Sequence, residues 1–272
     1  MNKQSRLMGL VRSIGPARLV AVAVLIAPFY IPSAKAADIR VMISGGLSAA
    51  YKELVPQFEK MTGSTVITSY GPSMGNTENA IPVRLARGEP ADVLIMVGDA
   101  LGAMISKGYA DSNSRVDLVR SPIGMVVRAG APKPDISTPE ALKATLLSAK
   151  SVAYSDSASG VYVGKELFKR LGIASEMEGK ARMIPAEPVA GVVARGDAEL
   201  GFQQISELLP ISGAELVGPI PPELQKITIF SAALTKDSKA REQAKALIGF
   251  LASAAAAPAL VKSGMEPIAP AQ

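Results

Sequence analysis

The chain of 272 residues contains no cysteine, no histidine and no tryptophan, and only 4% of its residues are aromatic. Without cysteine there are no disulfides, so the fold must be stable on its core alone. Without His and Cys the usual zinc sites are excluded, as are Ser-His-Asp and Cys-His catalysis. We therefore expect no metal and no cofactor, and any chemistry must come from carboxylates, Lys, Tyr, Ser, Arg or backbone dipoles.

Hydrophobic residues make up 48% of the chain, which excludes disorder as the default state. The length suits one large domain or two domains of ordinary size. We find no internal repeat by residue identity.

The first 36 residues have the pattern of a signal peptide. A basic leader precedes an apolar run over 19–31, and Ala34 and Ala36 are the small residues that a signal peptidase reads. The alternative is a membrane anchor, but the run is shorter than the roughly 20 residues that a span needs. We expect cleavage after Ala36 and export to the periplasm.

The formal net charge of +5 belongs to the leader. Of the 29 Lys and Arg residues five lie in the leader, which holds none of the 24 acidic residues. The exported part therefore carries 24 residues of each sign and is close to neutral. This balance removes the bulk support for a nucleic-acid partner.

A strand, a small polar loop and a helix follow one another three times in the first part of the chain. The strands are expected at 39–43, 66–70 and 91–97, and the loops that follow them at 44–48, 71–77 and 98–99. This rhythm predicts an α/β fold with a parallel sheet flanked by helices. Ligands in such sheets bind beyond the carboxyl ends of the strands, where these loops lie.

The second part of the chain repeats this plan after a Pro-rich connection at 129–134. We expect strands at 123–128, 151–154, 198–204 and 227–234, and helices beginning near Pro139, at 161–171 and at 238–256. The polar loop at 155–160 and the polar end of the third of these strands mark a second set of ligand-facing loops.

Several short motifs occur in an order and spacing that are typical of one family. They are Ser44-Gly45-Gly46-Leu47, Gly71-Pro72-Ser73, Arg87-Gly88-Glu89-Pro90-Ala91-Asp92-Val93, Ser157-Ala158-Ser159-Gly160 and Arg195-Gly196-Asp197-Ala198-Glu199-Leu200-Gly201. Together they resemble the periplasmic molybdate-binding proteins of ABC transporters and their wider superfamily of class II solute-binding proteins. The resemblance covers essentially all of the chain beyond the leader.

This resemblance implies a periplasmic binding protein type II fold. Each of two lobes is then a mostly parallel sheet flanked by helices, and two crossing strands, near 119–127 and 218–229, join the lobes. The first lobe would comprise 37–122 and 229–272, and the second 123–228. The family also implies a monomer that closes on its ligand between the lobes.

The expected binding residues lie in the loops and at the ends of strands. They are Ser44, Gly45, Gly46, Ser73, Met74, Gly75, Asn76, Thr77, Arg84, Ser157, Ser159, Gly160 and Gln204. Three or four helix N-termini would supply about +1.5 to +2 of positive charge to a small anion. Arg84 offers a fork for a carboxylate; the alternative is a solvated helix residue or a residue that pairs with Glu89.

The site departs from the molybdate pattern at three places. Gly46 stands before Leu47 where the family usually has Ser, Gln204 stands where it usually has Tyr, and the second loop is longer by residues 74–77. These departures resemble a divergent branch of the superfamily that includes a periplasmic aconitate isomerase.

Three functions therefore compete. The first is a binding protein that captures a small polyanion, such as the tricarboxylate aconitate, and delivers it to an ABC-type permease. The second is a cofactor-free aconitate isomerase on the same scaffold, and the third is a molybdate or tungstate receptor. An isomerase needs a base, for which Glu78, Asp156, Glu187, Tyr162 or a desolvated Lys are candidates without a sequence signature.

Overall fold

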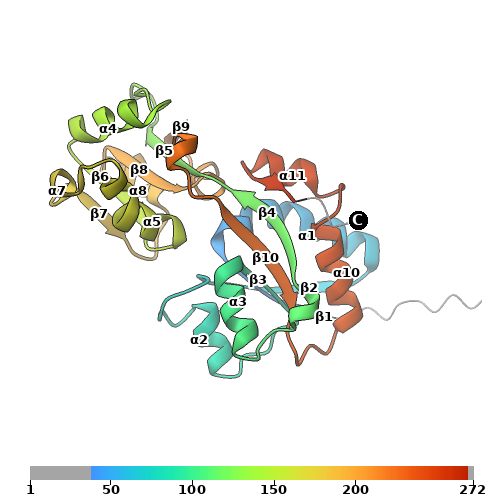
Figure 1. The fold of residues 1–272 in the computed structure, drawn as a ribbon. Helices are drawn as coiled ribbons and strands as arrows, with labels where there is room; N and C mark the ends of the chain where they lie inside the picture. The colour runs from blue at the N-terminus through green and yellow to red at the C-terminus, as the bar shows by residue number, and fades with distance from the viewer. Residues whose placement is uncertain (1–37, 269–272) are drawn as a thin grey trace, which may run out of the picture. The chain divides into compact units, whose positions relative to one another are not determined.

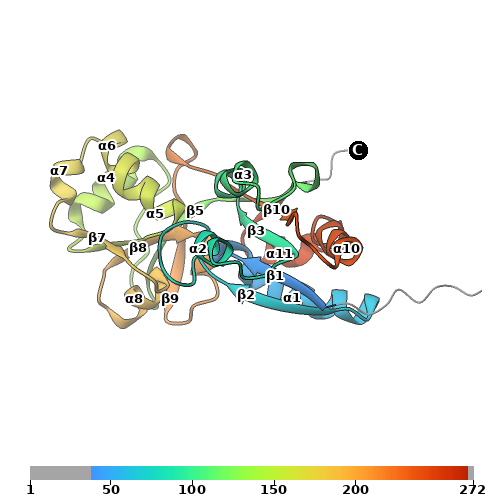
Figure 2. The same cartoon turned by 90° about the horizontal axis from the view of Figure 1, so that it is seen from below.

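A computed structural model of the protein describes residues 38–268, which form two β-sheets with helices on their faces (Figures 1 and 2). We call the six-stranded sheet with its helices the first lobe, and the five-stranded sheet with its helices the second lobe. The predicted signal peptide and its cleavage after Ala36 lie outside the described residues.

The first sheet has the strand order β11-β4-β10-β3-β1-β2. Its strands are β1 (Asp38–Ile43), β2 (Thr65–Tyr70), β3 (Val93–Val97), β4 (Val116–Ser121), β10 (Thr228–Leu234) and β11 (Glu266–Pro267). β1 lies parallel between β2 and β3. β10 pairs antiparallel with both β3 and β4, and β11 pairs antiparallel with β4.

The second sheet has the order β7-β6-β8-β5-β9. Its strands are β5 (Ile123–Arg128), β6 (Val152–Ser155), β7 (Ala181–Ile184), β8 (Leu200–Gln204) and β9 (Ala214–Pro219). β6 lies parallel between β7 and β8, and β5 pairs antiparallel with β8 and β9. Each sheet is therefore mixed: three parallel strands form one side, and antiparallel strands form the other.

Two chain segments link the sheets. Pro122 alone separates β4 of the first sheet from β5 of the second, and the chain returns between β9 and β10 (Figure 1). These crossings lie at the two places where the family resemblance expects them. They also explain the antiparallel strands, because each lobe receives a strand that enters from the other.

Helices cover both faces of each sheet. In the first lobe they are α1 (Ser48–Thr62), α2 (Ile81–Ala86), α3 (Gly98–Ser106), α10 (Arg241–Leu251) and α11 (Ala257–Lys262). In the second they are α4 (Pro139–Ser148), α5 (Ala158–Tyr162), α6 (Phe168–Arg170), α7 (Ala174–Met177), α8 (Val189–Arg195) and α9 (Ile205–Leu208). Short 3₁₀ turns lie at Gly45–Leu47, Ser112–Ser114 and Pro222–Leu224, and a π turn at Val163–Leu167.

Strand alternation divides the core into layers. In β1, Ile39 and Val41 pack with α1 and α10 on one face, while Met42 packs with α2 and α3 on the other. The second sheet is divided in the same way, with Val152 and Ala153 in two separate clusters. Because helices cover both faces, a ligand is expected at the loops beyond the carboxyl ends of the parallel strands.

The helix expected at 238–256 is wrong at both ends. Residues 238–240 are held by the Asp92 carboxylate, which accepts hydrogen bonds from the Ser238 hydroxyl and from the amides of Lys239 and Ala240. The helix therefore begins at Arg241. It ends at Leu251, and α11 begins separately at Ala257, with Pro258 in its first turn.

Two further helix boundaries differ from expectation. The helix expected directly after the loop at 71–77 is α2, and it begins only at Ile81, because Pro82 occupies its first turn and Ala80 is extended. The helix expected at 161–171 starts earlier, at Ala158, and continues through the π turn into α6. The loop after β2 is therefore longer than expected, and the loop after β6 is shorter.

Candidate functional site

The carboxyl ends of the parallel strands bring together the loops that sequence analysis selected. In the first lobe, β1 ends at Ser44, whose amide donates to the Ile95 carbonyl of β3 (3.0 Å), and the Gly71 amide after β2 donates to the Ile43 carbonyl (3.1 Å). In the second lobe, β6 ends at Ser155 and β8 ends at Gln204. These are the positions at which α/β sheets bind ligands.

The first loop is made of small residues because other groups lie against it. A methyl group added at Gly45 would lie 2.4 Å from Glu207 Oε1 of the second lobe, and one added at Gly46 would lie 2.1 Å from the Phe230 ring of β10. Gly46 therefore serves packing inside the first lobe. Gly45 lies directly against a carboxylate that belongs to the other lobe.

Three serine hydroxyls gather at the end of β6. Ser155 Oγ lies 2.7 Å from Ser157 Oγ and 3.2 Å from Ser159 Oγ, and the latter two are 3.3 Å apart. Ser155 and Ser159 are buried, while Ser157 is partly exposed. The cluster lies at the N-terminus of the helix that starts with α5, where hydroxyls and free amides suit an oxyanion.

Gly160 lets the serine cluster form. A methyl group at this position would lie 1.6 Å from the Ser155 carbonyl oxygen, so a side chain here would push the helix away from the strand end. Of the predicted residues in the second lobe, the structure therefore brings Ser157, Ser159 and Gly160 together.

The predicted binding residues in the loop after β2 differ from one another in burial and in hydrogen bonding. Ser73 is buried, and its hydroxyl accepts a hydrogen bond from the Val97 amide (2.9 Å), so it fastens the loop to β3 and does not cap α2. Gly75 has a φ of +95°, the left-handed region that favours glycine. Gly75, Asn76 and Thr77 are exposed, and Met74 is partly buried.

Arg84 and Gln204 already have partners within the protein. Arg84 forms an ion pair with Glu89 (2.6 Å), the alternative considered from the sequence. Gln204 is buried where the two lobes join. Its amide nitrogen is oriented to donate to the carbonyls of Ser121 (3.0 Å) and Pro122 (3.2 Å), and its oxygen accepts from the Thr228 hydroxyl (2.7 Å). Ligand contact by either residue stays a prediction without support from these contacts.

Glu207, in α9, is the functional candidate that sequence reasoning missed. Its side chain is partly buried between α9 and the first loop of the other lobe. Burial raises the pKa of Glu207 to about 7; a hydrogen bond from Gln203 opposes the shift, and the negative charge of Asp156 adds to it. Among the described residues, no ion pair involves Glu207. The available signal was the position of Glu207 shortly beyond the carboxyl end of the buried strand β8, where ligand-facing groups are expected.

The other groups considered as bases are engaged or exposed. Glu187 pairs with Arg195 (3.2 Å), and the Asp156 carboxylate accepts from the Ala186 amide (3.1 Å). The Tyr162 hydroxyl is buried between the Leu224 carbonyl and Arg170. Glu78 is an exposed loop residue. Glu207 differs from these groups because it is partly buried at the junction of the lobes and lies directly against Gly45.

Two buried hydroxyls near this junction lack hydrogen-bond partners among the described residues. They belong to Ser44 and Ser206, which precede Gly45 and Glu207 in the chain. A buried hydroxyl without a partner is costly, and a ligand oxygen can satisfy it. Over residues 38–268 no group of three or more His, Cys, Asp and Glu side chains is placed to hold a metal ion.

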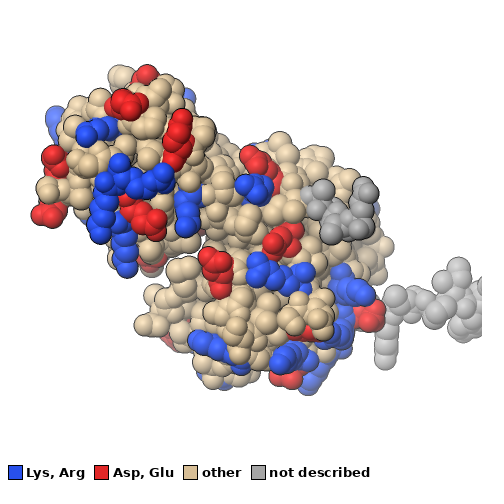
Figure 3. Space-filling model, in the orientation of Figure 1, with Lys and Arg blue, Asp and Glu red and all other residues tan. Residues whose placement is uncertain are grey.

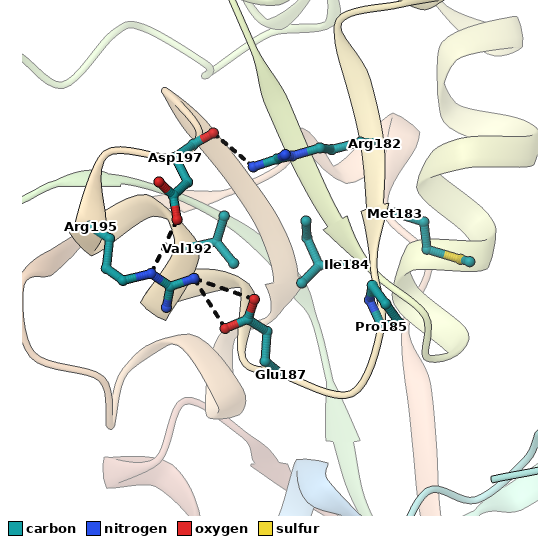
Figure 4. A pocket seen from close by; sticks show the side chains of 8 residues that line it. All are labelled: Arg182, Met183, Ile184, Pro185, Glu187, Val192, Arg195 and Asp197. Carbon is teal, nitrogen blue, oxygen red and sulfur yellow. Dashed lines mark hydrogen bonds and ion pairs between the residues drawn. The ribbon is translucent and has the colours of Figure 1, made fainter.

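A separate pocket of about 500 Å³ lies on the second lobe, between β7 and α8 (Figure 4). Arg195 points toward both Glu187 and Asp197 there, and Arg182 donates to the Asp197 carbonyl (2.9 Å) (Figure 4). The charged side chains of this pocket therefore form ion pairs and hydrogen bonds with one another or with the backbone. On the face drawn in Figure 3, Lys and Arg are interspersed with Asp and Glu, as the even charge balance leads us to expect.

Comparison with known proteins gives a consistent family. A model of the bacterial extracellular solute-binding proteins matches residues 39–266. The chain is 53% identical over 232 residues to an aconitate isomerase of a Pseudomonas species, which covers 85% of this chain and 88% of that protein. It is 26% identical over 228 residues to the molybdate-binding protein ModA of Azotobacter vinelandii, covering 80% and 86%.

A solved structure shares the fold at lower identity. The substrate-binding domain of a putative molybdenum ABC transporter from Clostridium difficile superposes with a TM-score of 0.68 at 17% identity, over 86% of this chain and all of that one. Within the described residues, no helix combines the length and apolar character needed to cross a membrane.

Proposed function

Because this chain belongs to the bacterial extracellular solute-binding proteins, we propose that it binds aconitate between its lobes and interconverts the cis and trans isomers. The observation that carries this proposal is the 53% identity to an aconitate isomerase over 85% of the chain. The relatives named as molybdate-binding are far more distant, at 26% and 24% identity. The departures at Gly46, Gln204 and residues 74–77 agree with this reading.

The proposed binding site suits an anion. The serine cluster at the end of β6 offers hydroxyl donors, and the hydroxyls of Ser44 and Ser206, which have no partner within residues 38–268, offer two more. α1 and the helix that starts with α5 begin beside the same loops. Each helix N-terminus is equivalent to about half a positive elementary charge and therefore attracts an anion. Separate donor groups on two lobes suit a ligand whose carboxylates are spread over a short carbon chain.

The lobes would close on this ligand as rigid bodies. We place their boundaries at 122/123 and 228/229, beside the two crossing segments. Gln204 lies there, in contact with Ser121, Pro122 and Thr228. A hinge motion needs only small backbone changes at such crossings.

We further propose the periplasm as the location, with cleavage after Ala36 and a monomeric protein. A receptor role with an ABC-type permease is the second candidate, because the family consists of solute-binding proteins. The two roles differ in turnover, since a receptor returns its ligand unchanged.

Incubation of the purified protein with each aconitate isomer separately, followed by liquid chromatography of the two isomers over time, tests the proposal. An isomerase converts both starting samples to the same final ratio, at a rate proportional to protein concentration. Thermal stabilisation by aconitate without conversion would leave a receptor. Stabilisation by molybdate and not by aconitate would replace both roles with an oxyanion receptor.

A further inference from the structure

The proposed reaction requires a proton acceptor that can reach the substrate, and the junction of the lobes holds one. Glu207 lies in α9, which follows β8 without a linker. β8 is the middle strand of the second sheet, between β6 and β5, and its last two residues pair with Gly124 and Ile123 of β5. The carboxylate therefore projects from a rigid part of the lobe, as the positioning of a catalytic group requires.

The Glu207 carboxylate lies against the first lobe at Gly45, a position without a side chain. Gly45 lies so close to Glu207 Oε1 that an added methyl group would be only 2.4 Å from this atom. No larger residue can occupy position 45 without displacing the carboxylate. A substrate held by the first loop and by the serine cluster would thus lie beside Glu207.

The surroundings of Glu207 favour proton transfer. Gln203 Oε1 accepts from the Val189 amide (3.1 Å), which leaves the amide nitrogen of Gln203 to donate to Glu207. Asp156, directly after β6, adds a like charge that acts on Glu207 in the same direction as burial. Burial and this like charge bring the pKa of Glu207 to about 7, so the acid and base forms coexist near neutral pH.

We propose that Glu207 is the catalytic residue that removes and returns the proton during isomerisation, an inference that rests on the proposed function. A carboxylate oxygen of Glu207 takes a proton from the methylene carbon of aconitate. The C–H electron pair enters the allylic system, and the double bond moves by one position. The proton then returns to the carbon at the far end of that system, so a new methylene forms and no atom is gained or lost.

The decisive variant is Glu207→Gln, which keeps the shape of the side chain and removes its basicity. We expect kcat to fall by about 10²- to 10⁴-fold, the usual contribution of general acid–base catalysis. Aconitate affinity, measured by calorimetry, should stay the same or increase, because a negative charge beside an anionic ligand is lost. The matched control is Glu166→Gln, an exposed residue of the π turn in the same lobe, which should leave kcat unchanged.

The outcomes separate this inference from the proposed function. If the wild-type protein converts aconitate and Glu207→Gln converts it within threefold of the same rate, only the assignment of Glu207 is overturned. If Glu207→Gln loses affinity together with turnover, Glu207 is a binding residue and the assignment is again overturned. If the wild-type protein converts neither isomer, both proposals fall.

A second measurement does not depend on the folding of the variant. The wild-type kcat should rise with pH through about 7 as Glu207 ionises, and Glu207→Asp should retain part of the activity with this limb displaced. A kcat that is flat between pH 5.5 and 8.5 in the wild-type protein would contradict Glu207 as the base.

Discussion

The two lobes share one strand plan and differ in what their loops carry. In both lobes a central strand, β1 or β6, lies between two parallel neighbours, and the third parallel strand pairs antiparallel with a crossing strand. The same positions at the strand ends are thus available twice. In the first lobe the central strand is followed by glycines, and in the second lobe it is followed by hydroxyl side chains.

The contrast is clearest after the central strands. β1 is followed by Gly45 and Gly46, whose missing side chains leave room for Glu207 and Phe230. β6 ends in the hydroxyl cluster of Ser155, Ser157 and Ser159. The first lobe thus allows Glu207 to lie close to its backbone, and the second lobe supplies hydroxyl donors and the proposed base. Duplicated architecture therefore allows one lobe to specialise without a change of fold.

The largest effect on stability is expected from substitution of Gly160, whose missing side chain lets the serine cluster form. Gly160→Ala places a methyl group 1.6 Å from the Ser155 carbonyl oxygen, and a backbone atom cannot move aside cheaply. We expect the free energy of unfolding to fall by about 3 kcal/mol, at the upper end of overpacking effects. Chemical denaturation measures it.

The control for this variant lies in the first lobe. Gly249 is an exposed residue of α10, and an added methyl group there meets nothing within 4 Å. Gly249→Ala should stabilise the protein by about 0.5–1 kcal/mol, because alanine favours the helix. Equal effects of the two substitutions would show that the close contact at Gly160 is not a constraint.

The next effect separates a ligand contact from a structural one. Ser157→Ala removes a partly exposed donor of the second lobe, and aconitate affinity should fall about 10- to 100-fold, as for a hydrogen bond to a charged group. Ser73→Ala leaves the Val97 amide without its acceptor, so stability should fall while affinity changes little. Calorimetry and thermal unfolding of both variants measure this, and the reverse pattern would assign the binding chemistry to the first lobe.

A smaller effect is expected at Asp92, whose carboxylate accepts hydrogen bonds from two distant segments of the first lobe. Burial raises the pKa of Asp92, but hydrogen bonds from Arg40, Ser238, Ala240 and Lys239 more than offset this and leave it below its ordinary value. Asp92→Asn should cost about 1–2 kcal/mol at pH 7, because an NH₂ group would then face the Arg40 amide.

The pH dependence of this variant has a defined sign. A carboxyl whose pKa is lowered by folding stabilises the native state above the unfolded pKa of about 3.9, and the contribution is lost as pH falls through the folded pKa. The difference between wild type and Asp92→Asn should therefore be constant from pH 7 to 5 and shrink below about 4. Urea titrations at pH 7, 5 and 3 measure it; a difference that grows on acidification would contradict it.

The smallest effect is expected at Arg84. Because this side chain pairs with Glu89, Arg84→Gln should lower stability by less than about 1 kcal/mol, as is usual for ion pairs near the surface. Aconitate affinity should be unchanged. A tenfold loss of affinity would instead restore Arg84 as the carboxylate clamp expected from the sequence, and would move part of the charge recognition into the first lobe.

The sequence predicts the parts of the fold in which a pattern is strong. The strands at 39–43, 66–70 and 123–128 lie within one residue of β1, β2 and β5, because these segments are rich in β-branched and other strand-forming residues and are bounded by turn residues. β4, β7 and β9 were not predicted. β7 is an edge strand with Arg182 and Met183 exposed, and all of β9 is at least partly exposed, so neither shows the pattern of a buried strand.

The site was harder to predict because its contacts are tertiary. The serines after β6 could be selected from the loop alone, since polar loops at strand ends are a local feature. The meeting of Gly45 and Glu207 joins two lobes, and α9 has only four residues, too few for a periodic pattern. The Gln204 contacts depend equally on strands that are distant in sequence.

Proton NMR of the purified wild-type protein with cis-aconitate in heavy-water buffer tests the proposed isomerisation most directly. We expect trans-aconitate to appear and deuterium to enter its methylene group, because the proton on partly exposed Glu207 exchanges with solvent between removal and return. Broadened cis-aconitate signals with no trans isomer after hours would contradict it and leave a receptor that binds without converting.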